Sequence, residues 1–194
     1  MSKSRISNQT LFIGLLILAT STIAHAQNKK ESYKKLTDEN VREFIQYTTD
    51  ITTDKNVTLS QSETSQYLDF HIAPKARFKT SITYVVPGMP EQEKSLLLNK
   101  EDYINQVAQG AQSVEHYYTE TEIESIDISK DKESAGVTTV SNESGVMLMP
   151  NPEGGSTDVP IEGTSKCFQV LRLSKKGYIQ MYSANCKTRM EFRP

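Results

Sequence analysis

The sequence predicts an α+β fold, with three helices in the first 110 residues and a mainly antiparallel sheet in the remainder. Three segments of the first part carry apolar residues at helical spacing behind N-cap residues. The second part is rich in β-branched and aromatic residues that tend to alternate with polar ones. The polar turn Ser174–Gly177 ends in glycine and joins the last two strands as an antiparallel hairpin.

The first helix is expected over residues 37–52, because Thr37 is a suitable N-cap and Leu36 can pack against Val41 across it. The second helix is expected to begin at the capping box formed by Ser60 and Glu63, and to run until Pro74 stops it.

The third helix is expected to begin at Asn99 and to loosen near Gly110. The predicted strands cover residues 77–86, 122–129, 136–141, 166–173 and 178–185. Residues 87–95 read as an insertion. Residues 147–163 read as a long loop, because they contain three prolines and three glycines.

The N-terminal residues 1–26 are typical of a cleaved signal peptide. Lys3 and Arg5 precede an apolar run over residues 11–19, and Ala24-His25-Ala26 is a site that signal peptidase accepts. An uncleaved anchor is the alternative, but the run is shorter than the roughly 20 residues that span a bilayer. We expect an exported protein, periplasmic or extracellular, that begins at Gln27. Its residues 27–36 would form a flexible leader, and residues 37–194 one domain without a membrane span.

Charge and cysteine content restrict the function further. Without the signal, 22 − 2 = 20 basic residues face 24 acidic ones, which argues against a nucleic-acid partner. Export favours a disulfide between Cys167 and Cys186, although two separate buried thiols are the alternative. A simple four-residue turn would place Cys167 opposite Ala184, so the bridge needs a bulge or a diagonal contact.

Few residues suggest catalysis. After cleavage the histidines are His71 and His116, neither at metal-ligand spacing, and no phosphate or dinucleotide fingerprint occurs, so no metal or cofactor is expected. His71 is a weak catalytic candidate, since a histidine at the apolar end of a helix is more often part of the core. Asp69 lies two residues from it and does not share its helical face.

The order helix, helix, strand, helix and then long antiparallel strands resembles the cone-shaped fold of the nuclear transport factor 2 superfamily, which includes SnoaL-like and ketosteroid-isomerase-like proteins. The segment Ala73-Pro-Lys-Ala-Arg-Phe78 is similar to the opening of that family's first strand, and residues 166–186 are similar to its final hairpin. The resemblance covers about residues 37–192. It implies helices packed on a curved sheet, with a mouth that either holds an apolar ligand or is filled by side chains.

The resemblance also bears on catalysis. Catalytic members use a carboxylate early in the first strand, where this chain has Arg77, Lys79 and Thr80, and a second acid where it has Gln169. Enzyme activity is therefore not expected. The residues that could line the pocket are Tyr47, Tyr67, Phe70, His71, Phe78, Phe168 and Gln169.

The leading hypothesis is an exported, non-enzymatic protein that binds a small apolar ligand or an envelope protein, with homodimerisation implied by the resemblance alone. One alternative is a hydrolase or lyase that uses His71 with Asp69 or Tyr67. Another is a periplasmic subunit of a secretion or envelope machine.

Overall fold

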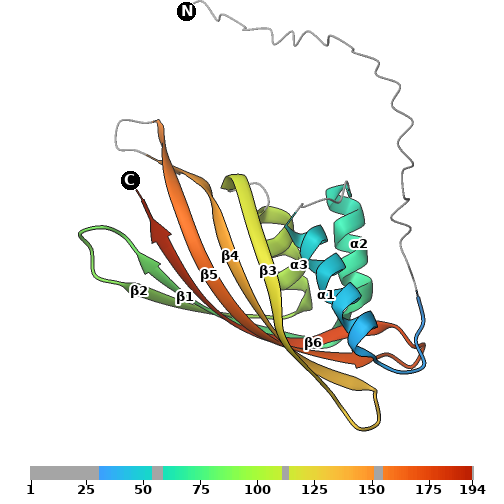
Figure 1. Cartoon of the computed structure of the whole chain (residues 1–194). Helices are drawn as coiled ribbons and strands as arrows, with labels where there is room; N and C mark the ends of the chain where they lie inside the picture. Colours follow the sequence, from blue (N-terminus) through green and yellow to red (C-terminus); the bar gives the residue numbers. More distant parts are fainter. Residues whose placement is uncertain (1–30, 54–58, 111–113, 151–154, 194) are drawn as a thin grey trace, which may run out of the picture.

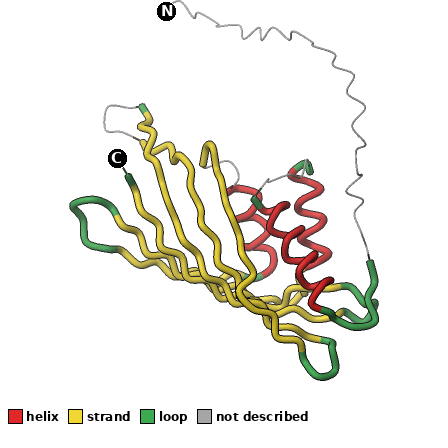
Figure 2. The backbone as a smooth tube through the Cα atoms, viewed as in Figure 1, coloured by secondary structure: helices red, strands yellow, loops and turns green. Residues whose placement is uncertain are grey.

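A computed structural model describes residues 31–53, 59–110, 114–150 and 155–193. The predicted signal peptide and its cleavage site between Ala26 and Gln27 lie outside these residues. Three helices lie against one side of a six-stranded sheet that curves around them (Figures 1 and 2). The elements are α1 (Asp38–Thr52), α2 (Gln61–His71), β1 (Ile72–Val85), β2 (Gln92–Leu98), α3 (Lys100–Gly110), β3 (Val114–Ile128), β4 (Ser134–Pro150), β5 (Ser156–Leu173) and β6 (Ile179–Phe192).

The sheet has the strand order β2-β1-β6-β5-β4-β3. All neighbouring strands are antiparallel except β1 and β6, which run parallel. The predicted α+β class with a mainly antiparallel sheet is therefore confirmed. The parallel pair brings the first and last strands together in the interior of the sheet.

Both predicted N-caps are present. Thr37 accepts a hydrogen bond from the amide of Asn40, and Ser60 and Glu63 form the reciprocal capping box. The end of α2 differs from the prediction, because the helix stops at His71 and the chain passes directly into β1. Pro74 lies inside β1, where the pairing with β6 is interrupted between Ile72 and Arg77. The absence of an N–H group on Pro74 therefore costs no hydrogen bond between β1 and β6.

The helices and the sheet share one apolar core. Leu36 and Val41 flank the start of α1 and are both fully buried, as the predicted contact across the cap requires. Leu68 of α2 belongs to the same cluster as Leu171 and Ile179 of the last hairpin. The core therefore fixes α1 and α2 against β5 and β6.

Two of the predicted irregular segments contain strand residues. Residues 92–98 form β2, paired with β1 through a turn that contains Gly88 at φ +78°. Its side chains are mostly exposed, so it lacks the apolar alternation that marks a strand.

The long loop predicted over residues 147–163 is also wrong, because residues 147–150 of β4 and 156–163 of β5 are paired strand residues. Pro160 is tolerated because its carbonyl accepts from the amide of Arg193, just beyond the end of β6. The Pro160 nitrogen faces the same side of β5 as the Pro160 carbonyl, toward β6. The missing N–H therefore costs no bond to β4.

The predicted hairpin and disulfide are both present. Gly177 takes φ +80° in the turn between β5 and β6, and Cys167 is bonded to Cys186. The two cysteines face each other because the register moves twice relative to a simple hairpin. Leu173 pairs with Ile179, one residue later than expected, and a bulge at Val170 and Leu171 adds a second residue.

The predicted leader is described from residue 31 onward, and this part is attached to the domain. The Tyr33 amide donates to the Gly177 carbonyl at 2.7 Å, and the Leu36 amide donates to the Lys132 carbonyl at 2.7 Å. Among the described residues, no helix combines the length and the apolar character needed to cross a membrane.

Candidate functional site

A pocket of about 280 Å³ lies between the sheet and the helices α1 and α3, and we call it the inner pocket. Residues of two helices and the sheet line it: the last turns of α1, Tyr103 of α3, and the strands β1, β3, β4, β5 and β6. Its volume is slightly below the 300–1,000 Å³ of ordinary small-molecule sites. It is therefore suited to a small ligand.

The inner pocket is lined chiefly by hydroxyl groups. Nine threonines and two serines occur among its 22 lining residues. The reason is strand alternation, since Thr139, Ser141 and Glu143 occupy every second position of β4 and so face the same side. The sequence led us to expect a small apolar ligand or an envelope protein partner, and this lining instead favours a ligand with hydrogen-bonding groups.

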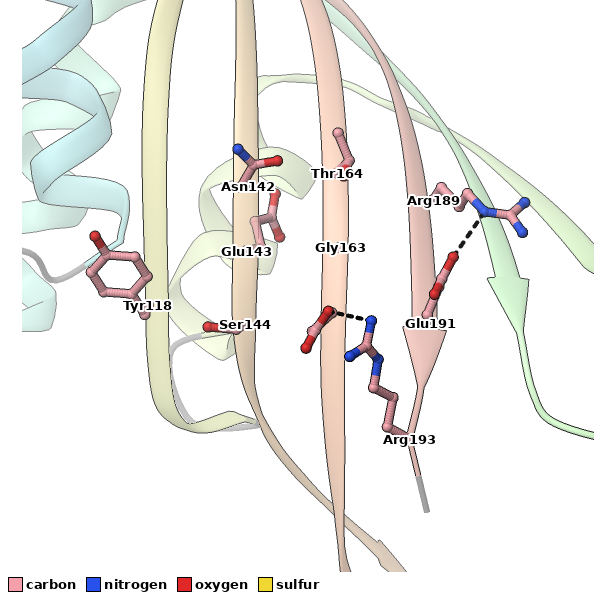
Figure 3. Close-up of a pocket in the computed structure, with 10 residues that line it drawn as sticks. Tyr118, Asn142, Glu143, Ser144, Gly163, Thr164, Arg189, Glu191 and Arg193 are labelled. Carbon is pink, nitrogen blue, oxygen red and sulfur yellow. Dashed lines mark hydrogen bonds and ion pairs between the residues drawn. The ribbon is translucent and has the colours of Figure 1, made fainter.

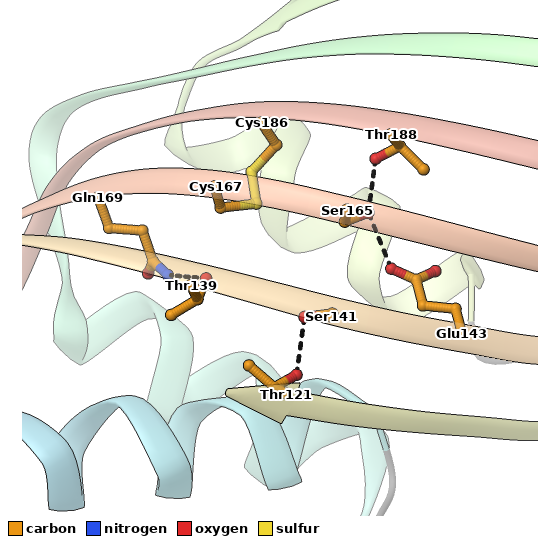
Figure 4. The surroundings of a disulfide bond; sticks show 9 residues. All are labelled: Thr121, Thr139, Ser141, Glu143, Ser165, Cys167, Gln169, Cys186 and Thr188. Carbon is orange, nitrogen blue, oxygen red and sulfur yellow. Dashed lines mark hydrogen bonds between the residues drawn. A yellow bond between two sulfur atoms is a disulfide. The ribbon is translucent and has the colours of Figure 1, made fainter. Parts of the chain in front are cut away.

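Hydrogen bonds hold these side chains in fixed positions (Figure 4). The Ser165 hydroxyl donates to the Glu143 carboxylate at 3.0 Å and lies 2.7 Å from the Thr188 hydroxyl. Farther along the same face, the hydroxyls of Thr121 and Ser141 are 2.8 Å apart. The pocket wall is therefore a connected polar surface that spans β3 to β6.

Tyr117 of β3 is the second partner of Glu143. Its phenol donates a hydrogen bond to the carboxylate, and partial burial together with the negative charge of Glu143 raises the pKa of Tyr117. The phenol therefore stays protonated across the physiological range. Glu143 thus accepts hydrogen bonds from two neutral hydroxyl donors, Tyr117 and Ser165.

The disulfide forms part of the same wall. Cys167 and Cys186 both line the inner pocket, and Figure 4 places their bond beside Ser165. The bridge joins the two strands that carry Ser165 and Thr188, two residues from each cysteine. It therefore covalently fixes the register of the wall at the point where the hydroxyl network crosses from β5 to β6.

The structure brings only part of the predicted site together. Phe78 and Gln169 line the inner pocket, and the Gln169 amide donates to the Thr139 hydroxyl at 3.3 Å. Tyr67 is buried, and its hydroxyl lies 2.9 Å from that of Thr48, a lining residue of α1. Tyr47 lies elsewhere, in an open groove between α1 and β3.

Phe168 lies on the outer face of the sheet and is 50% exposed. Its neighbours Cys167 and Gln169 both line the inner pocket. Successive side chains of a strand point to opposite faces, so Phe168 points away from the pocket. Its ring covers Gly136 instead, where a Cβ atom would approach the ring to 3.1 Å.

His71 and Phe70 belong to an aromatic cluster at the end of α2. The His71 ring centroid lies 4.4 Å from that of Tyr67 and 4.9 Å from that of Phe70. Nδ1 of His71 is 2.8 Å from the carbonyl oxygen of Ile179, so Nδ1 carries the proton and donates. Burial lowers the pKa of His71, which favours the neutral ring.

The partners considered for His71 have other roles. Asp69 forms an ion pair with Lys100 at 2.8 Å, and its carboxylate is exposed. His71 is not among the residues that line the inner pocket. The described residues contain no group of three or more His, Cys, Asp or Glu side chains placed to hold a metal ion.

Sequence reasoning missed Glu143 and Tyr117, the acidic and phenolic groups of the inner pocket. The pattern that places Glu143 was available, since it continues the alternation of Thr139 and Ser141 by one step. The predicted strand ended at Ser141, which left Glu143 outside it. An irregular stretch of β3 sets the direction of the Tyr117 side chain. In this stretch His116 has φ +51° and the pairing with β4 shifts.

A second hollow, of about 490 Å³, lies toward the outer face of the sheet, and we call it the outer groove (Figure 3). Asn142, Thr164 and Arg189 lie opposite one another in the register and share this face. Its two arginines are already paired, Arg189 with Glu91 and Glu191, and Arg193 with Glu162. The arginine side chains are half-exposed, so these pairs add little to binding or stability.

Comparison with known proteins gives likenesses in structure but none in sequence. No protein-family model matches the sequence. No curated protein matches it either. The structure of a type 2 hexachlorocyclohexane dehydrochlorinase is similar with a TM-score of 0.50 and 8% identity, over 80% of this chain and 90% of that one.

Two bacterial structures are similar at lower scores. A nuclear transport factor 2-like superfamily protein from Salmonella enterica has a TM-score of 0.45 and 9% identity, over 76% of this chain and 87% of that one. A ketosteroid isomerase-like protein from Erwinia carotovora atroseptica has a TM-score of 0.39 and 12% identity, over 79% and 93%. The chain has the cone-like α+β fold of the nuclear transport factor 2-like superfamily.

Proposed function

We propose that this protein is an exported binding protein, without catalytic activity, that holds one small polar ligand in the inner pocket. The observation that carries the proposal is the lining of that pocket, a hydrogen-bonded wall of threonine and serine hydroxyls around one carboxylate. Polar groups fixed in this way can orient a small molecule that is enclosed between the sheet and α1.

The absence of a catalytic role is supported by the residues at the positions where catalytic members of the superfamily carry acids. Arg77 and Lys79 are exposed, and Thr80 has a side chain that does not ionise. Gln169 does line the pocket, but its amide is hydrogen-bonded to Thr139 and has no proton to take up or release at neutral pH. These four side chains do not supply the carboxylate base of those members.

Export is supported by two independent features. Residues 1–26 have the charged start, apolar run and small-residue site of a signal peptide. The disulfide between Cys167 and Cys186 is typical of proteins that fold in an oxidising compartment such as the periplasm or the extracellular space.

Native mass spectrometry of the mature protein, purified gently from its own host, tests this function. We expect a protein ion that carries one small molecule, released unchanged in mass when the complex is dissociated. Thr139→Val with Ser141→Ala should reduce the retained fraction, because these substitutions remove two pocket hydroxyls without adding bulk. Thr138→Val, on the outer face of β4, is the matched control.

Three results would contradict the proposal. A protein ion without a bound molecule would show that the pocket holds no ligand. An envelope protein retained instead would favour docking to a partner. A released molecule whose mass changes during incubation would indicate catalysis. The alternative hydrolase or lyase that uses His71 would require the reaction to occur at the aromatic cluster of α2, outside the inner pocket.

A further inference from the structure

Among the described residues that line the inner pocket, one charge faces inward, and it is negative. Glu143 and Lys79 are the charged residues among its lining. Lys79 is exposed and lies between Phe78 and Thr80, which line the pocket, so alternation directs its ammonium group to the outer face. Glu143 is half-buried and points toward Ser165 on the pocket side (Figure 4).

None of the ion pairs found among the described residues neutralises Glu143. Its two donors, Ser165 and Tyr117, are uncharged. Two nearby cations have other partners, since Lys166 of β5 pairs with Glu124 and Arg189 of β6 pairs with Glu91. A carboxylate has about four acceptor sites, so Glu143 keeps capacity for a donor supplied by a ligand.

Resting on the function proposed above, we infer that the ligand is a small molecule with a protonated amine beside hydroxyl groups, in which the ammonium binds Glu143. An ammonium donates charge-assisted hydrogen bonds, which are roughly twice as strong as neutral ones. The hydroxyls of Thr121, Ser141 and Thr139 lie along the same wall and both donate and accept, which matches the hydroxyl groups of an amino alcohol or amino sugar.

Isothermal titration of the mature protein with two matched pairs of probes tests the inference. The pairs are D-glucosamine with D-glucose, and 2-amino-1,3-propanediol with glycerol, in phosphate buffer at pH 7. We expect the amine of each pair to bind at least about tenfold more tightly than its neutral counterpart. Glu143→Gln should remove this preference, because it keeps an acceptor for Ser165 and deletes the charge.

Glu120→Gln is the control, because Glu120 is exposed and lies opposite Asn142 on the outer face of the sheet. It should keep the preference of the wild type. Equal binding of amine and neutral probe would overturn the inference while leaving the proposed pocket intact. If none of the four probes binds, the inference is contradicted. The mass-spectrometric experiment then decides separately whether the pocket holds a ligand.

Discussion

The carbonyl oxygen of Tyr33 lies 2.6 Å from the position that a Cβ atom would occupy on Gly177. The Tyr33 amide also donates to the Gly177 carbonyl, so the segment before α1 runs directly over the turn between β5 and β6. Only a residue without a side chain fits there. Because Gly177 also has φ +80°, the turn and the attached segment both depend on this glycine.

Gly177→Ala should therefore destabilise the protein by more than its backbone conformation explains. Gly88→Ala is the matched control, because Gly88 has φ +78° and, beyond its chain neighbours, no atom of the described residues lies within 4 Å of the point that its Cβ would occupy. We expect Gly88→Ala to cost about 1 kcal/mol, and Gly177→Ala at least about 1 kcal/mol more through lost contacts of Tyr33. Urea unfolding of both variants measures the difference, and equal losses would show that the Tyr33 contact does not contribute.

Replacing both Cys167 and Cys186 by serine should lower the free energy of unfolding by about 3 kcal/mol. The disulfide closes a loop with a sequence separation of 19, and such a cross-link restricts the unfolded chain by about this amount. Dithiothreitol should lower the midpoint of urea unfolding for the wild type and leave the double variant unchanged. A double variant as stable as the oxidised wild type would contradict the prediction.

The hydroxyls of Thr48 and Tyr67 should be energetically coupled. They lie 2.9 Å apart in the core, so Tyr67→Phe and Thr48→Val should each cost about 1–2 kcal/mol by leaving a buried partner unsatisfied. The double variant should cost less than the sum of the two, by about 1 kcal/mol. A double-mutant cycle measured by chemical denaturation checks this. Strict additivity would mean that the bond adds no stability.

His71 should make stability depend on pH. Its pKa in the folded protein lies below the ordinary value because burial disfavours the charged ring. The unfolded chain therefore binds more protons between the two pKa values, and this part of the stability is lost as the pH falls below about 6.5. His71→Asn keeps a side-chain N–H and should remove this dependence, at most about 1.4 kcal/mol per pH unit.

Unfolding by urea at several pH values between 5 and 8 measures the effect as a difference from the wild type, which cancels the contribution of the carboxylates. His116→Asn is the control. His116 is exposed and has φ +51°, a conformation that asparagine adopts readily. A wild-type slope in the His71 variant would contradict the prediction.

The features that could be predicted from the sequence are those set by neighbouring residues. Thr37 and Ser60 cap their helices through side chains three residues away, and Gly177 marks its turn, so each signal lies within a few positions. The strand β2 gives no such signal. It is held by pairing with β1, and most of its own side chains face solvent.

The inner pocket was harder to predict because its members come from separate strands. Glu143, Ser165 and Thr188 meet only after three strands pair in a register that includes a bulge. That bulge and the turn that is one residue longer than expected together set Cys167 opposite Cys186, whereas counting back from a four-residue turn placed it opposite Ala184. A one-residue change of register moves every later side chain to the other face. Reasoning from the sequence therefore found the pair of cysteines but not the wall that they share with Glu143.

The parallel pairing of β1 with β6 has a consequence for the order in which the chain folds. Ile72 pairs with Met181, which follows it by 181 − 72 = 109 positions, so the interior of the sheet closes only when the last strand arrives. During synthesis from the N-terminus, α1, α2 and the β1–β2 hairpin are complete long before β6, so one edge of β1 stays unpaired until then. Contacts of this sequence separation form slowly. Truncation before β6 would therefore leave two unjoined half-sheets and prevent a stable, smaller domain.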